Sequence, residues 1–411
     1  MQSSKGDDYY FFERRNKILM EKKEEKNFSA LSPKAFRTRQ EIRAPMTNPK
    51  GRDFIIGLDV GYSATKVFFE TGCLCFPSYA KRIDAGSLTR TDEKDILYRD
   101  EETGDVYIVG YNAQDMIDIT DTNDTDGELF SRKRYSDARF KIVCKTALAL
   151  ATRGKTDNRK IVIQTGLPAH YVKTDSNMLK QSLCEDGPFS LKVGNGKWER
   201  FDIKIDKDDI FVMAQPAGAL YSAIIKKDGH FSDMAKDILS DSVIVLDIGF
   251  GTFDFYGIRN RAVDIVETIN DIGMHQVMAE TSKLIFDEYG EEVRVAAIQQ
   301  DLETGIVECF NEEEMRSESK QIAPLLEKAN KTIMKDAMNR AKSVAKSFRG
   351  YHYAIVDGGT GEAWLNDIRE WLSGLKTLKV MPSNINDGLP LIYSNSRGYY
   401  MYRYQQNKRR R

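Results

Sequence analysis

Cysteine and histidine are scarce in this sequence, and neither sign of charge dominates it. Five cysteines and four histidines stand among 411 residues, which excludes a disulfide framework and favours a reducing compartment. Cys73 and Cys75 lack the second pair or the neighbouring histidine that a zinc site needs. Lysine and arginine total 61 against 62 aspartates and glutamates, a net charge of −1. This balance argues against a protein that coats nucleic acid or a membrane surface.

The sequence also lacks a long apolar run. No stretch approaches the roughly 20 residues that a membrane-spanning helix needs, and the first residues do not show the basic-then-apolar order of a secretion signal. We therefore expect a cytoplasmic protein with no membrane partner. Hydrophobic residues make up 41% of the chain, which is enough to bury a sizeable core. At this length, two or three domains are expected.

Residues 1–52 differ from the rest of the chain in charge. They hold 13 basic and 7 acidic residues, a net charge of +6 in a chain whose total is −1. Their apolar periodicity is not sustained, which predicts a solvated, flexible extension. A second hypothesis is that translation can begin at Met46, eight residues before the first clear strand at Phe54.

From Phe54 onward, strands and helices alternate, which predicts a mixed α/β fold. Short β-branched or aromatic runs indicate strands, and apolar residues at helical spacing indicate helices. The expected strands are 54–60, 65–70, 106–109, 160–165, 201–204, 243–248, 253–258 and 353–356. The expected helices are 140–153, 216–227, 277–288, 325–348 and 362–375.

One local pattern occurs twice. Each copy places an aspartate, Asp59 or Asp247, at the end of an apolar strand, and a glycine-rich turn and a second strand follow. Glycine lets backbone amides approach an anion closely, and convergent N–H groups in such a turn can hold phosphate oxygens. An aspartate at the strand end can orient the waters of Mg²⁺ beside those phosphates. Lys66 adds a positive charge that can reach them.

Either turn alone is more often an ordinary hairpin connection. Two matched copies about 190 residues apart are harder to explain as connectors. A third turn, Gly358-Gly359-Thr360-Gly361, stands between an expected strand and an expected helix. Its glycines let a nucleoside lie against the backbone at a helix N-terminus, which favours negative charge.

These three motifs resemble the phosphate-1, phosphate-2 and adenosine motifs of the ATPase superfamily of actin, sugar kinases and heat-shock chaperones. Within it, the chain is most similar to the bacterial actin-like ParM (StbA) proteins that segregate plasmids. The similarity covers roughly residues 54–380. Further segments follow in that family's order: GDVYIVGYNAQ (104–114), TGLPAHYV (165–172), VMAQPAGALY (212–221), VIVLDIGFGTFDF (243–255) and NDIGMHQVM (270–278).

The resemblance implies an α/β fold of two lobes, each a mixed five-stranded sheet flanked by helices, with a nucleotide in the cleft between them. Lobe I would comprise residues 53–240, with a small inserted subdomain near 80–135, and lobe II would comprise 241–385. Residues 386–411, which end in a basic tail, would return to lobe I. The family pattern has no counterpart for residues 1–52.

The resemblance also implies which residues hold the nucleotide, which would be ATP, or GTP in its place, with Mg²⁺. Asp59 and Asp247 would face each other across the metal and act through its waters. The other contacts would come from both sides of the cleft: Gly61, Tyr62, Ser63 and Lys66 on the phosphates from one side, Gly249, Gly251 and Thr252 from the other, and Gly273, Gly358, Gly359 and Thr360 beside the nucleoside.

The segment VMAQPAGALY matches the family's strand-to-helix turn that carries the residue for the attacking water. Gln215 stands where ParM-type proteins usually have glutamate and actin has glutamine. An amide can hold a water in line but cannot accept its proton at neutral pH. We therefore expect slow intrinsic hydrolysis that accelerates when a neighbouring subunit or lobe closure fixes the water. The alternative is that Gln215 only precedes Pro216 at the start of a helix.

Three functions stay open at this point, because a fold does not specify a function. The first is an ATPase that polymerises into filaments and segregates plasmid DNA through a DNA-bound adaptor of ParR type, without reading DNA sequence itself. The second is a small-molecule kinase, which needs a catalytic aspartate where Gln215 stands. The third is a chaperone or reactivase ATPase, for which the 26 residues after Ile385 are too few to form a peptide-binding domain.

Overall fold

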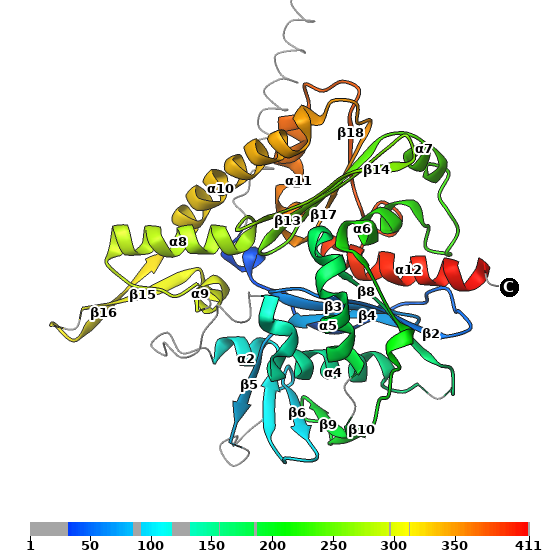
Figure 1. The fold of residues 1–411 in the computed structure, drawn as a ribbon. Helices are drawn as coiled ribbons and strands as arrows, with labels where there is room; N and C mark the ends of the chain where they lie inside the picture. The colour runs from blue at the N-terminus through cyan, green and yellow to red at the C-terminus, as the bar shows by residue number, and fades with distance from the viewer. Residues whose placement is uncertain are drawn as a thin grey trace, which may run out of the picture.

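Figure 1 shows the computed structural model of the chain, which describes residues 32–84, 92–116, 132–155, 157–184, 187–295, 297–311 and 313–409. The expected α/β class is confirmed: strands form two large sheets, one smaller sheet and a two-stranded hairpin, and helices pack against them. Within the described ranges, no helix is long and apolar enough to cross a membrane.

The first large sheet has six strands in the order β1-β4-β3-β2-β8-β11. β2 pairs antiparallel with β3 and parallel with β8, so the sheet is mixed. All seven residues of β2 are buried because both faces are covered: Ile56 and Leu58 pack in one core with α4, and Ile55 packs in another with α12. The elements of this layer are β1 (Glu41–Pro45), β2 (Phe54–Val60), β3 (Ala64–Phe69), β4 (Gly72–Pro77), β8 (Ile161–Leu167), β11 (Ile210–Ala214), α4 (Ala138–Thr152) and α5 (Val172–Cys184).

A five-stranded sheet in the order β10-β9-β6-β7-β5 lies at one end of this layer. It extends beyond the subdomain expected near residues 80–135, because β9 pairs antiparallel with β6 and brings residues 189–201 into the same sheet. Its elements are β5 (Ala80–Ile83), β6 (Ile96–Asp100), β7 (Val106–Val109), α2 (Tyr111–Asp115), β9 (Phe189–Val193) and β10 (Glu199–Phe201). The 3-10 turns η2 (Arg132–Ser136), η3 (Ala169–Tyr171) and η4 (Lys207–Asp209) contact α5 instead. Together with the six-stranded sheet, the five-stranded sheet forms lobe I.

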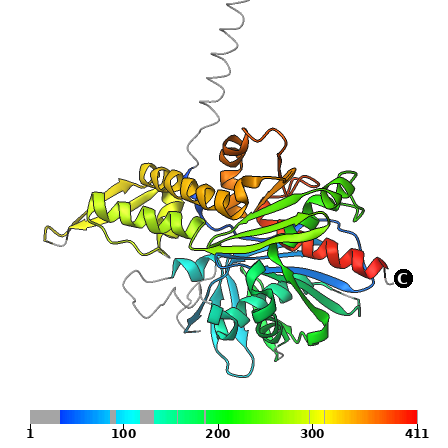
Figure 2. The same cartoon turned by 45° about the horizontal axis from the view of Figure 1, so that its top comes forward.

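The second large sheet, in the order β14-β13-β12-β17-β18, forms lobe II with its helices. Figure 2 shows α8 and α10 side by side, and the β15–β16 hairpin extends from that end of the molecule. The elements are β12 (Val243–Ile248), β13 (Thr252–Arg259), β14 (Ala262–Asn270), α8 (Met274–Tyr289), α9 (Ile298–Thr304), β15 (Ile306–Asn311), β16 (Arg316–Gln321), α10 (Ala323–Val344), η5 (Lys346–Phe348), β17 (Tyr353–Asp357), α11 (Gly359–Leu372) and β18 (Lys379–Pro382).

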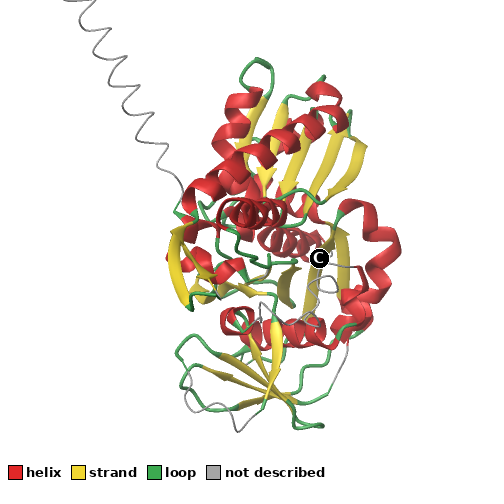
Figure 3. Cartoon of the chain, turned by 90° about the vertical axis from the view of Figure 1, so that its left-hand side faces the viewer, coloured by secondary structure: helices red, strands yellow, loops and turns green. Residues whose placement is uncertain are grey.

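Two helices lie between the two large sheets. Figure 3 shows these sheets as separate groups of strands, one above the other. The two helices are α6 (Gln215–Ile224) and α12 (Ser394–Arg409), accompanied by α7 (Ala235–Ser240) and the turn η6 (Leu391–Tyr393). Ala219 and Ala223 of α6 and Tyr400 of α12 share one core with Val245 of lobe II. The buried Arg397 of α12 donates to the carbonyl oxygens of Ser222 and Ile225 at the end of α6, each at 2.9 Å. The two helices therefore form the joint between the lobes.

The expectation of a flexible extension over residues 1–52 is wrong for its second part. Residues 33–36 form the turn η1 (Pro33–Phe36), and β1 adds to the edge of the lobe I sheet by pairing antiparallel with β4. This pairing also gives the lobe I sheet six strands where five were expected. Apolar periodicity could not reveal it, because an edge strand is held mainly by backbone hydrogen bonds to a partner that lies elsewhere in the sequence. Residues 1–31 lie outside the described residues.

Candidate functional site

A cavity of about 280 Å³ lies where the two lobes meet, close to the lower end of the range for ligand pockets, ~300–1,000 Å³. Most of the site residues expected from the sequence line it. They are Asp59, Gly61, Tyr62, Ser63, Lys66, Gln215, Asp247, Gly249, Thr252, Gly358, Gly359 and Thr360. Gly251 and Gly273 are not among the residues that line the cavity.

The two turns that resemble each other in sequence are closed by the same backbone hydrogen bond. The N–H of Gly61 donates to the carbonyl oxygen of Ala64 at 3.0 Å, and the N–H of Gly249 donates to that of Thr252 at 2.9 Å. A Cβ added at Gly251 would come within 3.5 Å of the Tyr62 ring, so the turns approach each other. The structure therefore places two matched hairpins, one from each lobe, at one cavity.

The two aspartates have different neighbours across their hairpins. β3 places Lys66 opposite Asp59, and the Lys66 ammonium lies 2.8 Å from Oδ2 of the Asp59 carboxylate. The other oxygen, Oδ1, accepts a hydrogen bond from Nε2 of Gln215 at 3.1 Å. β13 instead places a second carboxylate, Asp254, opposite Asp247. Asp59 therefore has a positive partner, whereas Asp247 faces negative charge.

Asp247 is the middle member of a row of three buried carboxylates on neighbouring strands. Asp254 of β13 pairs with it on one side, and Asp357 of β17 pairs with it on the other. Burial, together with the charges of Asp357, Asp254 and Asp59, raises the pKa of Asp247 well above its usual value. Burial raises the pKa of Asp357 to about 7 and that of Asp254 to about 6. The row concentrates carboxylate groups that a bound cation would stabilise in their charged form.

The three turns are also tied to one another. The hydroxyl of Thr360 donates to the carbonyl oxygen of Gly249 at 2.7 Å. Gly358 has a φ of +86°, and a Cβ there would lie 2.2 Å from the carbonyl oxygen of Ile248. Gly273 has a φ of +128°, and a Cβ there would lie 2.4 Å from the carbonyl oxygen of Gly249. Only glycine permits these close approaches, so Gly273 lets its backbone pack against the turn at Gly249.

Sequence reasoning missed three side chains that shape the cavity. Asp357 stands directly before the glycine turn, and Asn395 of α12 donates from Nδ2 to Oδ2 of Asp247 at 2.8 Å. The buried Arg134 lies over the Tyr62 ring at 4.2 Å and donates to the carbonyl oxygen of Val60 at 2.8 Å. For these three residues, the sequence held one signal: Asp357 stands directly before the glycines of the third turn. Arg134 and Asn395 come from distant parts of the chain.

Asp254 shares the strand face of Thr252, and its contacts indicate a structural role. Its carboxylate accepts hydrogen bonds from the Thr252 hydroxyl at 3.1 Å and from the N–H of Ala169 at 3.2 Å. The Thr268 hydroxyl donates to it as well. Because Ala169 belongs to lobe I and Thr268 to lobe II, Asp254 joins the lobes through these hydrogen bonds.

The carboxylates fit a magnesium ion that is held mainly by water and by a ligand. In the part of the chain that the structure describes, no group of three or more His, Cys, Asp or Glu side chains is arranged to hold a metal by itself. Asp59, Asp247 and Asp357 all line the cavity, and the buried Oδ2 of Asp357 has no hydrogen-bond partner among the described residues. Mg²⁺ usually keeps several waters and binds one or two carboxylates together with substrate phosphates.

Comparison with known proteins identifies the fold. The family described as "Actin like proteins N terminal domain" matches residues 57–218, and no curated protein sequence matches the chain. The resemblance to ParM and other actin-like proteins is confirmed, and so is the two-lobe fold that it implied.

Solved structures support this assignment at low sequence identity. The non-polymerisable quadruple mutant of pCBH ParM is 20% identical, with a TM-score of 0.64 over 86% of this chain and 99% of that one. A 15-stranded ParM filament from Clostridium botulinum is 19% identical, with a TM-score of 0.65 over 86% and 99%. The archaeal actin homologue Ta0583 is 18% identical, with a TM-score of 0.59 over 87% and 99%, and it has also been solved in complex with ADP.

Proposed function

We propose that the chain is a nucleotide-driven ATPase that assembles into filaments and segregates plasmid DNA through a DNA-bound adaptor protein of ParR type. The actin-like fold supports this proposal. In this proposal, lobe I comprises residues 53–240 and lobe II residues 241–385, and residues 386–411 return to lobe I. The ligand is ATP, or GTP in its place, with Mg²⁺.

One observation carries the nucleotide-binding part of the proposal. Two hairpins with matched turns, one from each lobe, bring Asp59, Lys66 and Asp247 to a single cavity. Turn amides and a lysine are suited to hold phosphate oxygens, and the carboxylates are suited to a hydrated divalent cation. Ta0583, which shares this fold, binds ADP.

In the proposed mechanism the chain contributes position and charge. Lys66 and the amides of the turns at Gly61 and Gly249 bind the phosphates, and Asp59 and Asp247 orient the waters of the metal. The metal, when bound, neutralises charge that develops on the transferred phosphoryl group. Gln215 orients the attacking water. Its Nε2 donates to Asp59, which fixes the orientation of the amide, and its Oε1 is the atom that can accept a hydrogen bond from water.

Self-association is proposed from the neighbours in fold, one of which is a ParM filament. A head-to-tail contact between copies of this chain would be heterologous, and such a contact generates an open filament when its rotation does not close. The adaptor and the DNA cargo are proposed with it, and no sequence-specific contact between this chain and DNA is required.

Assembly can be tested by light scattering and negative-stain microscopy after ATP and Mg²⁺ are added to the purified chain. We expect fibres that form with ATP and disassemble as phosphate is released. Transfer of phosphate to a sugar or an organic acid without fibres would instead identify a kinase. Gln215 weighs against that outcome, because it stands where such a kinase needs a catalytic aspartate.

A further inference from the structure

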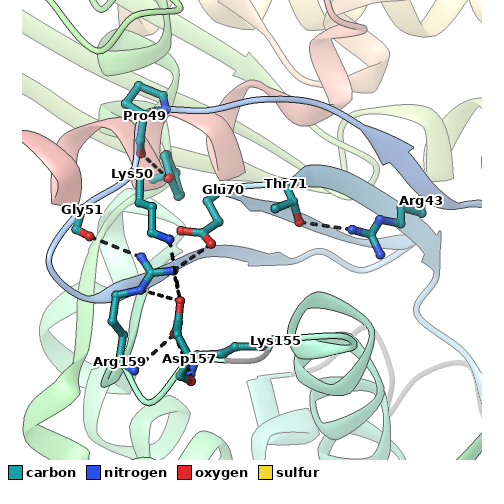
Figure 4. Close-up of polar contacts among 10 residues, drawn as sticks. Arg43, Pro49, Lys50, Gly51, Glu70, Thr71, Lys155, Asp157 and Arg159 are labelled. Carbon is teal, nitrogen blue, oxygen red and sulfur yellow. Dashed lines mark hydrogen bonds and ion pairs between the residues drawn. The ribbon is translucent and has the colours of Figure 1, made fainter.

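Residues 41–51 are fastened to lobe I along their whole length. β1 pairs with β4, and beyond it the N–H groups of Met46 and Asn48 donate to the carbonyl oxygens of Thr71 and Glu70, at 3.1 and 2.9 Å. Figure 4 shows the next contacts: Arg159 reaches both the Glu70 carboxylate, at 2.7 Å, and the carbonyl oxygen of Gly51, at 3.3 Å. This segment therefore fixes where residues 33–40 begin their path across the molecule.

Residues 33–40, which we call the N-terminal strap, leave lobe I and contact lobe II. Phe36 packs against the lobe II core. The N–H of the buried Thr38 donates to Oε1 of Gln299 at 3.0 Å, and Lys34 pairs with Glu303. Gln299 and Glu303 both belong to α9, so the strap spans from the edge of the lobe I sheet to a helix of the other lobe.

Arg37 joins the lobes directly. Its guanidinium donates to both oxygens of Asp115 on α2 of lobe I, at 2.7 and 2.8 Å, and to Glu303 on α9 of lobe II, at 2.7 Å. It also lies over the ring of Tyr111, 4.4 Å from the centroid. The Arg37 side chain is only 9% exposed. Charge-assisted hydrogen bonds in such partly buried geometry are among the stronger polar contacts in proteins.

The strap also forms part of the wall of the candidate nucleotide site. Residues 35–39 line the same cavity as Asp59, Lys66 and Asp247. Burial raises the pKa of Glu362, in the first turn of α11, and the positive charge of nearby Arg39 opposes that rise. The strap therefore lies beside the helix whose N-terminal glycine turn is the expected nucleoside contact.

We propose that residues 35–39 are an outer wall of the nucleotide site, and that Arg37 is a positioning residue that holds the two lobes closed over the bound nucleotide. The proposal rests on the nucleotide-binding function proposed above. It adds to the nucleotide site a segment that precedes residues 57–218, the part of the chain that matches the actin-like family. Nucleotide leaves the site when Arg37 separates from Asp115 or Glu303.

Nucleotide release from the full-length chain tests this proposal. A fluorescent ATP analogue is bound with Mg²⁺ and chased with excess ATP in a stopped-flow instrument, for the wild type, Arg37→Gln and Glu303→Gln. We expect both variants to release the analogue at least about tenfold faster, which corresponds to ~1.4 kcal/mol. The double variant should be no faster than Arg37→Gln alone, because both changes break the same contact.

Lys34→Ala is the matched control, since Lys34 pairs with the same Glu303 but is 66% exposed. Its release rate should stay within about twofold of the wild type, because exposed ion pairs contribute little. Glu303→Gln keeps the test decisive if Arg37→Gln fails to fold, because it leaves the strap intact.

The other outcomes separate this proposal from the proposed function. Release rates unchanged in both variants, with the analogue bound normally, would overturn the role of Arg37 alone. Faster association and tighter binding in the variants would overturn it too, because the strap would then obstruct the site. If the wild type binds no analogue at all, the nucleotide-binding function fails, and this proposal fails with it.

Discussion

The Gln215 amide donates from Nε2 to Oδ1 of Asp59, with 3.1 Å between the two atoms. The contact joins the first residue of α6 to the end of β2, and Lys66 approaches the other carboxylate oxygen of Asp59. The residue expected to orient water and one carboxylate expected to act through the metal therefore form a single hydrogen-bonded unit. Asp59 fixes the amide in place before any ligand enters.

Replacing Gln215 tests whether this amide positions water. We expect Gln215→Ala to lower the single-turnover rate of ATP hydrolysis by about 100-fold, the lower range for a residue that handles the attacking group. Gln215→Glu should keep hydrolysis and make it depend on pH, because a carboxylate can accept the proton. Single-turnover rates at several pH values measure both. An alanine variant that hydrolyses ATP as fast as the wild type would remove Gln215 from the mechanism.

The carboxylate row predicts how stability depends on pH in the absence of ligand. Asp254 and Asp357 have pKa values of about 6 and about 7 in the folded chain, above the unfolded value of about 3.9. Between these values the folded state binds more protons than the unfolded state. The contribution of these two groups to the free energy of unfolding is therefore fully present below about pH 4, and it is lost as the pH rises through 6 to 7. We expect the melting temperature of Asp254→Asn to drop less with rising pH than that of the wild type, by several degrees.

Thermal unfolding of the wild type and Asp254→Asn at pH 5 and at pH 7.5 gives the comparison. Titrating groups remote from Asp254 cancel in the difference between the two proteins, and Asp247, whose pKa the charge of Asp254 raises, adds to the effect in the same direction. Equal slopes for the two proteins would show that Asp254 titrates in the folded chain as it does in the unfolded one.

The joint between the lobes predicts a large stability effect at Arg397. Its guanidinium pairs with Asp387, and both side chains are 2% exposed. Removing one partner of a buried pair leaves an uncompensated charge and costs ~3–5 kcal/mol, so Arg397→Ala should unfold at a markedly lower urea concentration. Lys331→Ala, which breaks the exposed pair with Glu327 on α10, should cost at most ~0.5 kcal/mol. Similar midpoints for the two variants would contradict this account of the joint.

Much of the fold could be predicted from local pattern. The strands at 54–60, 106–109 and 243–248 have the expected bounds, because each is a short apolar run that ends at a turn. The strand at 41–45 was missed because its residues are only partly buried and its partner, β4, lies beyond the next two strands. Pairing of this kind depends on contacts distant in sequence, which periodicity does not record.

The candidate site divides in the same way. Asp59, Gly61, Asp247 and Gly249 could be found because the pattern repeats. Arg134 and Asn395 could not, since each reaches the site from an element that carries no motif. The same limit applies to the N-terminal strap. Its basic charge indicated a solvated extension, whereas Arg37 finds its carboxylate partners on α2 and α9. The hypothesis of a start at Met46 stays a prediction, and a chain that began there would lack the strap.

The central claim is that Asp59 and Asp247 converge on one magnesium-bound nucleotide. Isothermal titration calorimetry of ATP in the presence and absence of Mg²⁺, on the wild type, Asp247→Asn and Asp254→Asn, tests it most directly. We expect one nucleotide per chain and binding that Mg²⁺ strengthens. In Asp247→Asn, the factor by which Mg²⁺ strengthens nucleotide binding should be at least about tenfold smaller than in the wild type, a loss of ~1.4 kcal/mol. Asp254→Asn, one strand away in the same row, should keep the wild-type factor. No nucleotide uptake by the wild type, or equal Mg²⁺ dependence in all three proteins, would contradict the claim.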